Sequence, residues 1–348
     1  MSSTHPITLI GGGLAGLVLG AALARAGMAV TLCEAGRLPR PRVCGEFISG
    51  LKPATVARLG LTPHLHGAAM NRSTGWHAGG RLRWAAELPE PAPGLSRMTL
   101  EARLLEDFVT AGGELRLNTR VPDGGDVPGQ VWTAGRRADA SSQWLGLKIH
   151  CRNLVLGHDL ELHLGRGGYV GAARIEDGRV NICSLFRVRP ELRGPREELL
   201  PAYIVACGLD KFAERIAQGD PDPASAAAVS GLDFMRISFD DERVSLGDHL
   251  AAIPPYTGHG MAMALEHAVA ALSPLINYAQ GDKNWPETSR EIRAAVAAQS
   301  GARLRWARTL HPWLLNPVKK SLLLALADTR LLPFNFLYQA THGESVAA

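Results

Sequence analysis

The sequence predicts an α/β protein with a Rossmann-like parallel sheet, an α+β layer built on an antiparallel sheet, and a helical C-terminal region. Three observations predict it. Residues 7–33 read as an apolar strand, a glycine turn, a helix and a second apolar strand, which is the βαβ unit of a parallel sheet. Residues 153–188 alternate apolar and polar side chains around glycine turns, which is typical of an antiparallel sheet. Residues 286–340 show helical periodicity, interrupted by prolines.

The first element is a buried strand at 7–10, followed by the tight turn Gly11–Gly13, a helix at 14–26 that ends at Gly27, and a strand at 28–33. This apolar stretch resembles a signal peptide in composition only, because no basic residues precede it. We therefore expect a buried βαβ unit rather than a targeting segment.

A hairpin, a helix and a strand come next. Residues 73–85 alternate around Gly79-Gly80, which predicts the hairpin. Thr99 is a candidate N-cap for a helix over 100–110, because its hydroxyl can accept a backbone N–H of the first turn. The apolar pattern at 114–118 predicts the strand.

In the second half, Glu176-Asp177-Gly178 predicts a hairpin turn between two strands of the antiparallel sheet. Residues 195–217 are predicted to be helical, residues 244–247 return to a strand, and a helix follows from Gly258. Prolines are expected to break the C-terminal helices at three positions: Pro312, Pro317 and Pro333.

Composition excludes several classes of protein. The chain has 348 residues, 46% hydrophobic and 20% charged, as in globular proteins. The net charge of +4 is too small to predict a nucleic-acid partner, and no run of about 18 apolar residues predicts a membrane span. The five cysteines form no CxxC pair, so neither a disulfide framework nor a metal site is expected, and a reducing cytoplasm fits best.

The glycine turn carries a nucleotide-binding pattern. Gly11, Gly13 and Gly16 fit G-x-G-x-x-G, with Leu14 and Ala15 between the last two glycines. These glycines permit a sharp turn and let a pyrophosphate approach the backbone. The pyrophosphate then lies at a helix N-terminus. Glu34, with Ala35 after it, ends the second strand, where a carboxylate can accept the ribose hydroxyls of an adenosine. A glycine-rich turn without a ligand is the alternative, and the pattern does not separate NAD from FAD.

Two later segments separate those cofactors. They are Ser96 to Leu105, which contains Arg97, and Arg243 to Met261, which contains Gly247-Asp248 and the turn Pro254-Pro255-Tyr256-Thr257-Gly258-His259-Gly260. Both segments resemble those of the FAD-dependent monooxygenase superfamily, the para-hydroxybenzoate hydroxylase fold. The resemblance implies that Arg97 lies near the phosphates, that Asp248 holds a ribityl hydroxyl, and that the glycine turn starts a helix aimed at the flavin.

A third segment resembles one branch of that superfamily. Arg42-Val43-Cys44-Gly45-Glu46-Phe47 is similar to the basic-x-Cys-Gly-Glu segment of geranylgeranyl reductases. The resemblance implies that Cys44 lies near the reacting carbon, where its thiol could donate a proton; the alternative is a small buried residue in a cofactor loop. The Tyr-x-Trp-x-Phe-Pro signature of those reductases is missing, and so is the Trp-x-Trp-x-Ile-Pro signature of flavin halogenases.

The resemblance also implies a domain division and a set of site residues. A discontinuous FAD-binding domain would take 1–70, 95–145 and 232–280, a substrate domain 71–94 and 146–231, and a helical region 281–348. The candidate catalytic residues are Cys44, Tyr256 and His259, with a structural role in the turn as the alternative for the last two. The candidate cofactor-binding residues are Gly11, Gly13, Leu14, Ala15, Gly16, Glu34, Ala35, Arg42, Val43, Cys44, Arg97, Val121, Asp248, Gly258, Gly260 and Met261.

These observations predict an FAD-dependent oxidoreductase, with monooxygenation of a sizeable apolar molecule favoured and NAD(P)H as a transient electron donor, since no second nucleotide fingerprint occurs. A flavin-dependent double-bond reductase is one alternative, and a flavin-binding protein without catalysis is another.

Residues 281–348 carry nine Lys/Arg against five Asp/Glu. This excess of basic residues has two interpretations. It is either an ordinary solvated helical face or a surface that binds anionic lipid headgroups. The residues concerned are Arg290, Arg293, Arg303, Arg305, Arg308, Lys319 and Lys320.

Residues 135–150 lie where the superfamily carries an Asp-Gly motif, of which Asp139 could be the remnant. Lys148 and His150 in this segment are interpreted either as residues that handle a pyridine nucleotide or, equally, as solvated strand residues.

Overall fold

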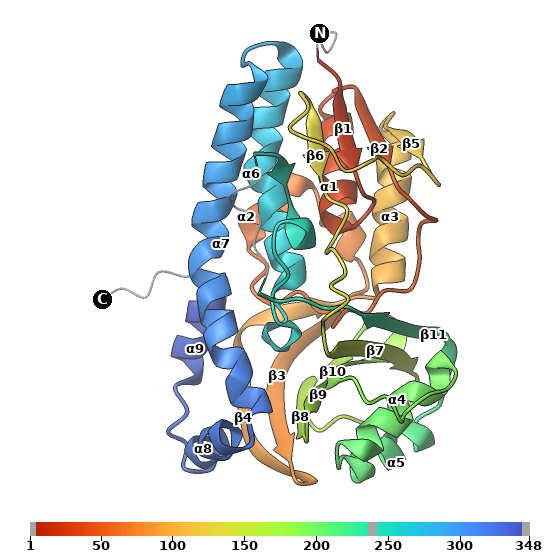
Figure 1. Ribbon diagram of the computed structural model, residues 1–348, viewed down its shortest axis with the longest axis vertical. Coiled ribbons are helices and arrows are strands. Elements are labelled where there is room, and N and C mark those ends of the chain that lie inside the picture. Colours follow the sequence, from red (N-terminus) through yellow and green to blue (C-terminus); the bar gives the residue numbers. More distant parts are fainter. Residues whose placement is uncertain (1–4, 236–241, 343–348) are drawn as a thin grey trace.

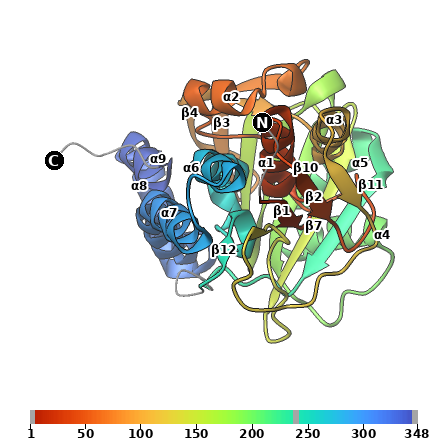
Figure 2. The same ribbon diagram turned by 90° about the horizontal axis from the view of Figure 1, so that it is seen from above.

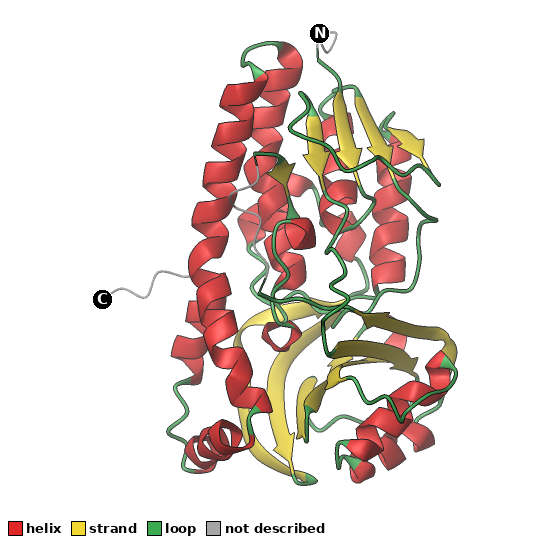
Figure 3. Cartoon of the chain, viewed as in Figure 1, coloured by secondary structure: helices red, strands yellow, loops and turns green. Residues whose placement is uncertain are grey.

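The computed structural model describes residues 5–235 and 242–342, and it contains two sheets stacked end to end with helices around them (Figure 1, Figure 3). The first sheet has five parallel strands in the order β12-β6-β1-β2-β5. Their bounds are β1 Ile7–Ile10, β2 Val30–Cys33, β5 Glu114–Arg116, β6 Gln130–Trp132 and β12 Val244–Ser245. This confirms the parallel sheet that the βαβ pattern predicts.

Helices cover this sheet because their apolar faces need a partner. Helix α1 (Leu14–Arg25) is buried at every position from Leu14 to Ala24, so its apolar character on all sides reflects a central place in the core. It packs between α3 (Arg97–Thr110) and α6 (Gly260–Gln280), while α2 (Pro53–Leu59) lies alongside. The short apolar strands and this helix form the main hydrophobic core.

The second sheet has seven strands in the order β11-β7-β10-β9-β8-β3-β4. Their bounds are β3 Ala69–Ala78, β4 Arg81–Gly94, β7 Trp144–Cys151, β8 Leu160–Gly165, β9 Gly168–Arg174, β10 Val180–Arg187 and β11 Pro221–Ser230. Neighbouring strands are antiparallel except β3 and β8, which pair in parallel. The sheet is therefore mixed rather than antiparallel throughout, because β3 enters it from the first domain and returns through β4 before β8 is added.

Helices pack on both faces of the second sheet. Alternate side chains of β7 and β10 pack against α4 (Arg196–Ala206) and α5 (Asp210–Gln218). Side chains on the other face form a core with α7 (Trp285–Leu315) and α8 (Pro317–Asp328), and α9 (Phe334–His342) completes this layer. Figure 2 shows the C-terminal helices on one side of the molecule and α4 and α5 on the other.

The structure corrects four local expectations. Helix α7 continues through Pro312, because the proline removes one backbone hydrogen bond while His311 and Leu314 stay buried against the sheet. Residues 195–217 form two helices, with Gly208 (φ +76°) at the bend between them. Helix α6 begins at Gly260 rather than Gly258. Helix α3 begins at Arg97, so its N-cap is Ser96, whose hydroxyl accepts the Thr99 N–H at 3.2 Å.

Among the described residues, no helix is both long enough and apolar enough to cross a lipid bilayer.

Candidate cofactor site

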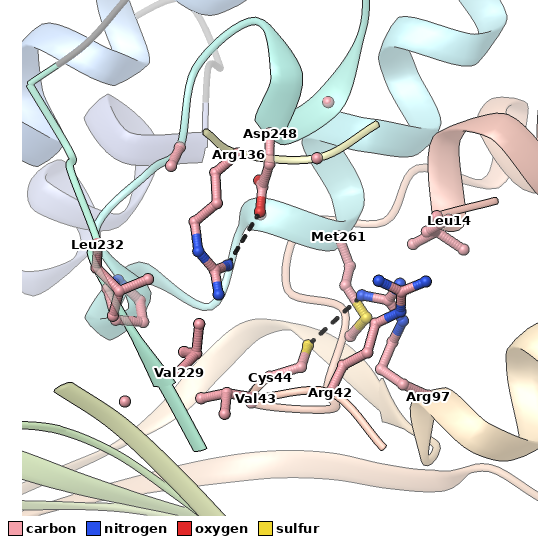
Figure 4. Close-up of a pocket in the computed structure, with 18 of the residues that line it drawn as sticks. Leu14, Arg42, Val43, Cys44, Arg97, Arg136, Val229, Leu232, Asp248 and Met261 are labelled. Atoms are coloured by element: carbon pink, nitrogen blue, oxygen red, sulfur yellow. Dashed lines mark hydrogen bonds and ion pairs between the residues drawn. The ribbon is translucent and has the colours of Figure 1, made fainter. Parts of the chain in front are cut away.

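A cavity of about 440 Å³ lies where the two sheets meet. Its walls come from the α1 turn, the loop before α2, the start of α3, strands β7, β10 and β11, and the start of α6 (Figure 4). It brings together eleven of the residues singled out in the sequence, which are Gly13, Leu14, Ala15, Arg42, Val43, Cys44, Arg97, Asp248, Gly258, Gly260 and Met261. Segments almost 250 residues apart in the chain thus meet at one cavity.

The glycine turn has a steric requirement at two positions. Gly11 has φ +111°, and a Cβ there would lie 2.3 Å from the Ala134 Cα. A Cβ on Gly16 would lie 2.2 Å from the Gly11 carbonyl oxygen, so Gly16 lets α1 approach the strand. At Gly13 the nearest atom to such a Cβ is the Thr133 carbonyl oxygen at 3.6 Å, which leaves the backbone open to the cavity. The local geometry matches the role that the fingerprint assigns to each glycine.

Glu34 lies beside this turn and is 6% exposed. Its carboxylate accepts the Gly12 N–H at 2.8 Å and the Gly36 N–H at 2.9 Å. The carboxylate is thus fixed at the carboxyl end of β2, beside the glycine turn. Ala35 is exposed and Val121 is half-buried in the loop between β5 and β6, and neither lines the cavity.

The cavity wall carries an excess of positive charge. Among the described residues that line it, the cations are Arg40, Arg42, Arg97 and Arg136, and the only carboxylate is Asp248. Buried Glu101 holds two of these arginines: Arg97 forms an ion pair with it, and Arg42 Nε lies 2.9 Å from its Oε1. One carboxylate shared by two guanidinium groups leaves positive potential for an anionic ligand such as a pyrophosphate.

Asp248 follows β12, with Arg136 Nη1 3.9 Å from its Oδ2. Burial within the site raises the pKa of this carboxyl, and the nearby Arg136, Arg97 and Arg42 offset only part of that effect. Opposite Asp248, α6 begins at Gly260 with Gly260 and Met261 in the cavity wall. Gly258 (φ +65°) makes the preceding turn, and a Cβ there would lie 2.2 Å from the Phe47 ring. The N-terminus of a 21-residue helix therefore faces the cavity.

Cys44 projects into the cavity from the loop before α2 (Figure 4). Burial raises the pKa of the Cys44 thiol, although Arg97, whose Nη1 lies 4.0 Å from the sulfur, acts in the opposite sense. The thiol is therefore protonated at neutral pH and can donate a proton. Cys183 of β10 also lines the cavity, and burial raises its pKa further.

The structure adds a group of buried charges that sequence reasoning missed. Glu46 has φ +59° and is fully buried, with Lys148 Nζ 2.7 Å from its Oε1 and His150 Nε2 2.5 Å from its Oε2. Lys148 and His150 are 1% and 3% exposed, so their interpretation as solvated strand residues is wrong. Alternation along the strand shows from the sequence only that both side chains face the same side of β7; the structure shows that this side faces the Cys44 loop.

Asn181 of β10 holds the same loop from the other strand. Its Nδ2 donates to the carbonyl oxygens of Cys44 at 2.9 Å and Gly45 at 2.7 Å. The Arg97 N–H in turn donates to Glu46 Oε1 at 3.0 Å. The second sheet thus fixes the Cys44 loop through side chains, and the loop contacts the start of α3.

A second cavity of about 160 Å³ adjoins the first and is lined mainly by apolar and aromatic side chains. The two cavities share Gly45, Phe47, Cys183, Ser184 and Pro255. Tyr256 lines the second cavity, and its hydroxyl donates to the Ala307 carbonyl oxygen at 2.9 Å. At one end Ser49 Oγ lies 3.1 Å from the Tyr338 hydroxyl and 2.8 Å from His342 Nε2, which gives the apolar cavity a polar end.

His259 lines neither cavity. It is fully buried, with Nδ1 3.0 Å from the Ser49 carbonyl oxygen and Nε2 2.9 Å from Arg303 Nη1. Burial, together with His342 and Arg303, holds the pKa of His259 well below its usual range. Its contacts fix the turn before α6, which is the structural role named as the alternative.

The residues in and beside the cavity have the chemistry that a dinucleotide such as FAD requires. The open backbone at Gly13, the arginines and the start of α6 line the cavity, and Glu34 lies beside the glycine turn.

Sequence comparisons give distant relatives. No family model matches the chain. It is 24% identical over 226 residues to the menaquinone reductase of Mycolicibacterium smegmatis, an alignment that covers 58% of this chain and 52% of that protein. It is 25% identical over 332 residues to conditioned medium factor receptor 1 of Dictyostelium discoideum, covering 79% of this chain and 64% of that protein. The chain thus spans about half to two thirds of the length of these curated relatives.

Solved structures give much fuller matches. Klebsiella pneumoniae HpxO, complexed with FAD and uric acid, has a TM-score of 0.74 at 15% identity over 98% of this chain and 97% of that one. The p-nitrophenol 4-monooxygenase PnpA of Pseudomonas putida has a TM-score of 0.71 at 14% identity over 98% of both chains. Pseudomonas aeruginosa PqsL, in complex with 2-aminobenzoylacetate, has a TM-score of 0.69 at 16% identity over 97% and 99%. The chain therefore has the fold of the FAD-dependent monooxygenases, the para-hydroxybenzoate hydroxylase fold, from its first described strand to its C-terminal helices.

Proposed function

We propose that the chain is an FAD-dependent oxidoreductase and that it catalyses an NAD(P)H-driven monooxygenation of a sizeable apolar molecule. The carrying observation is the pair of adjoining cavities, one rich in arginine and the other apolar, which meet at the Cys44 loop. A charged cavity beside an apolar one suits a dinucleotide cofactor next to an uncharged substrate.

The chain's own residues would divide the work. Arg42 and Arg97 would hold the pyrophosphate, Glu34 the ribose and Asp248 the sugar chain of the cofactor. The N-terminus of α6 would stabilise negative charge on the flavin ring, which favours its reduction. When bound, FAD supplies hydride acceptance and reaction with oxygen. The aromatic walls of the second cavity, including Trp76 and Tyr169, would exclude water from the reacting centre.

The proposal is tested first by cofactor binding and then by oxygen use. The purified chain is expected to be yellow, or to become so with added FAD, and to consume oxygen with NADH or NADPH. Candidate apolar substrates are expected to accelerate that consumption. A colourless protein that does not bind excess FAD would sink the proposal. A flavoprotein reduced slowly by every donor, with no stimulation by any substrate, would instead indicate a flavin-binding protein without catalysis.

A second function, reduction of a carbon–carbon double bond, is favoured by Cys44. Its thiol is protonated and lines the first cavity, next to Gly45, which both cavities share, and one distant relative is a menaquinone reductase. In such a reaction a hydride is delivered to one alkene carbon and Cys44 donates a proton to the other. Its sulfur then regains a proton from solvent.

Anaerobic turnover separates the two reactions. A reductase consumes NAD(P)H and substrate without oxygen, and Cys44→Ala is expected to slow it by about 10²–10⁴-fold. The matched control is Cys207→Ala, because this thiol is also buried but lies at the end of α4, in the core that α4 and α5 form and away from both cavities. A strict oxygen requirement, with Cys44→Ala nearly as active as the unsubstituted chain, supports monooxygenation.

The structure narrows the lipid-surface hypothesis. Arg303 is buried in an ion pair with Glu266, and Lys320 donates to the Gly165 carbonyl oxygen at 2.6 Å, so the basic residues do not share one exposed face. Exposed apolar side chains do gather on α8 and after it, at Val318, Leu322 and Leu331. We propose that this surface contacts a membrane that supplies an apolar substrate. Flotation with anionic and neutral vesicles tests it: binding lost in Leu322→Asp supports the contact, and no flotation in any salt excludes it.

A further inference from the structure

A polar cluster lies on the second sheet, on the face that α5 covers. His77 of β3 and His163 of β8 are register partners whose rings stack at 4.5 Å, and His163 stacks at 3.7 Å on Phe212 of α5. Glu161 of β8 and His158 of the preceding loop complete the group. Alternation along β8 places Leu162 on the other face, in the core beneath α7 and α8. Neither His77 nor His158 lines the two cavities described above, and Glu161 borders the second of them.

Three ligand atoms of this cluster converge. Among the described residues, one ring nitrogen each from His77 and His158 and one carboxylate oxygen from Glu161 all lie within 4.8 Å of one another. A tetrahedral zinc ion holds its ligand atoms about 3.3 Å apart at bond lengths of about 2.0–2.1 Å, so small side-chain rotations bring all three into range. Two histidines and a carboxylate form a common zinc ligand set with one position open.

Two ring nitrogens of these histidines are buried and have no hydrogen-bond partner. They are His77 Nε2 and His158 Nδ1. An unpaired buried nitrogen costs free energy, and two of them side by side call for a shared partner. His77 Nε2 lies 4.0 Å from Glu161 Oε2, which is beyond hydrogen-bond distance. A cation between them would satisfy both nitrogens together with the carboxylate.

Neighbouring groups fix the Glu161 carboxylate beside the two histidines. The Gly157 N–H donates to Glu161 Oε1 at 2.7 Å. His163 Nε2 lies 2.9 Å from Glu161 Oε2 and would orient the carboxylate from the second shell of ligands.

The surroundings of the cluster decide whether a metal ion can reach it and whether a neighbouring cation would repel that ion. Gly75 makes room for the His158 ring, because a Cβ there would lie 2.5 Å from His158 Nδ1. The His77 side chain is 18% exposed, which leaves a path for an ion. Arg215 Nη1 lies 3.2 Å from Glu161 Oε2 and opposes a cation, but its side chain is 35% exposed and its Nη2 donates to the Val155 carbonyl oxygen. Exposure screens that repulsion.

We propose that His77, His158 and Glu161 bind one divalent transition-metal ion, with zinc the expected occupant, and that this ion ties β3 to β8 and to the loop before it. The sequence gives no sign of the site, because its residues are separated by 81 and 3 positions and no cysteine takes part. The expectation that the chain has no metal site came from the cysteines alone.

The test measures zinc binding to the full chain after dialysis against a chelator. One zinc ion per chain is expected, with a thermal midpoint that rises with zinc concentration. Cobalt in its place is expected to give the visible absorption of a tetrahedral ion. His158→Ala and Gly75→Ala are each expected to weaken zinc binding at least about tenfold. The control His66→Ala removes an exposed histidine outside the cluster and is expected to change nothing.

A second measurement needs no variant to fold. Acylation of histidines by diethyl pyrocarbonate, read by mass spectrometry on the unsubstituted chain, is expected to fall at His77 and His158 when zinc is added and to stay constant at His66. Protection of these two rings with one bound ion supports the proposal. Absence of one-to-one binding, or equal modification with and without zinc, overturns it.

Discussion

The two walls of the cofactor cavity differ in the groups that form them: mainly backbone in one wall and mainly buried side chains in the other. The wall from the parallel sheet is mostly backbone, with the glycine turn before α1 and the N-terminus of α6 facing the cavity. The wall from the second sheet is organised by buried side chains, with Glu46 held by Lys148 and His150 and the loop carbonyls held by Asn181. The first wall follows from local sequence, whereas the second follows from residues that meet only in the folded chain.

This difference predicts different failures. A backbone wall tolerates side-chain changes as long as the turn is kept, since its donors are amide groups. A wall built on buried charges fails when one partner is removed, because the remaining charge is then buried without compensation. Substitutions on the two sides of one cavity should therefore have effects of different size and kind.

The largest effect is expected at Glu46. Glu46→Ala leaves Lys148, which is 1% exposed, without its partner, and should lower the free energy of unfolding by about 3–5 kcal/mol. Urea unfolding of the FAD-free chain measures this. The control Glu106→Ala removes an exposed carboxylate on α3 and should change stability by less than about 0.5 kcal/mol. Equal effects of the two substitutions would remove the distinction between the walls.

Acid should weaken the same contact. Burial alone would raise the pKa of Glu46, but His150 and Lys148 outweigh it and hold that pKa below its usual value. A carboxyl with a depressed pKa stabilises the fold above its unfolded pKa of about 4.3, and the contribution is lost as the pH falls through the folded pKa. The stability difference between the unsubstituted chain and Glu46→Gln should therefore be constant near neutral pH and shrink below about pH 4. Unfolding curves across that range check the sign.

A smaller effect, on affinity rather than folding, is expected at Arg97. Arg97→Ala removes one cation from the cavity while Arg42 keeps its contact with Glu101. Loss of a charged hydrogen bond to a phosphate should weaken FAD binding by about 1.5–3 kcal/mol, or roughly 10- to 100-fold. Flavin fluorescence titration measures it, with exposed Arg72→Ala as the matched control. Undiminished affinity would mean that backbone donors alone bind the phosphates.

Much of the first wall could be predicted from the sequence, because each part is encoded within a few residues. The turn Gly11–Gly13 directly precedes α1, and Glu34 directly follows the next strand, β2. Eleven of the sixteen proposed cofactor residues line one cavity. The other five do not: Gly11, Gly16, Glu34, Ala35 and Val121. Short-range patterns carry this information since each glycine acts on its immediate neighbours.

The second wall could not be predicted in the same way. Lys148 reads as a solvated strand residue because its partner, Glu46, is 102 positions away. The alternation in β7 shows that Lys148 and His150 share a face, but only the tertiary structure shows that the face is buried. The prediction that His259 borders the flavin differs from the structure for a similar reason. Its ring nitrogens contact the Ser49 carbonyl oxygen and Arg303 on α7, which are distant in the sequence, and the side chain lines neither cavity.

The smallest effect is expected at Ser96, where the two walls touch. Ser96 caps α3, and its own N–H donates to Glu176 Oε2 at 2.7 Å, so the turn between β9 and β10 fixes the start of the helix that carries Arg97. Ser96→Ala removes the cap but keeps that backbone bond, and should cost about 1 kcal/mol in unfolding. Thr309→Ala, an exposed helical position whose hydroxyl bonds its own helix, is the control and should change stability by less than about 0.5 kcal/mol. FAD affinity should stay unchanged in Ser96→Ala, because Glu176 still positions the backbone before Arg97. A fall in affinity as large as that of Arg97→Ala would show instead that the cap, and not the second sheet, positions this arginine.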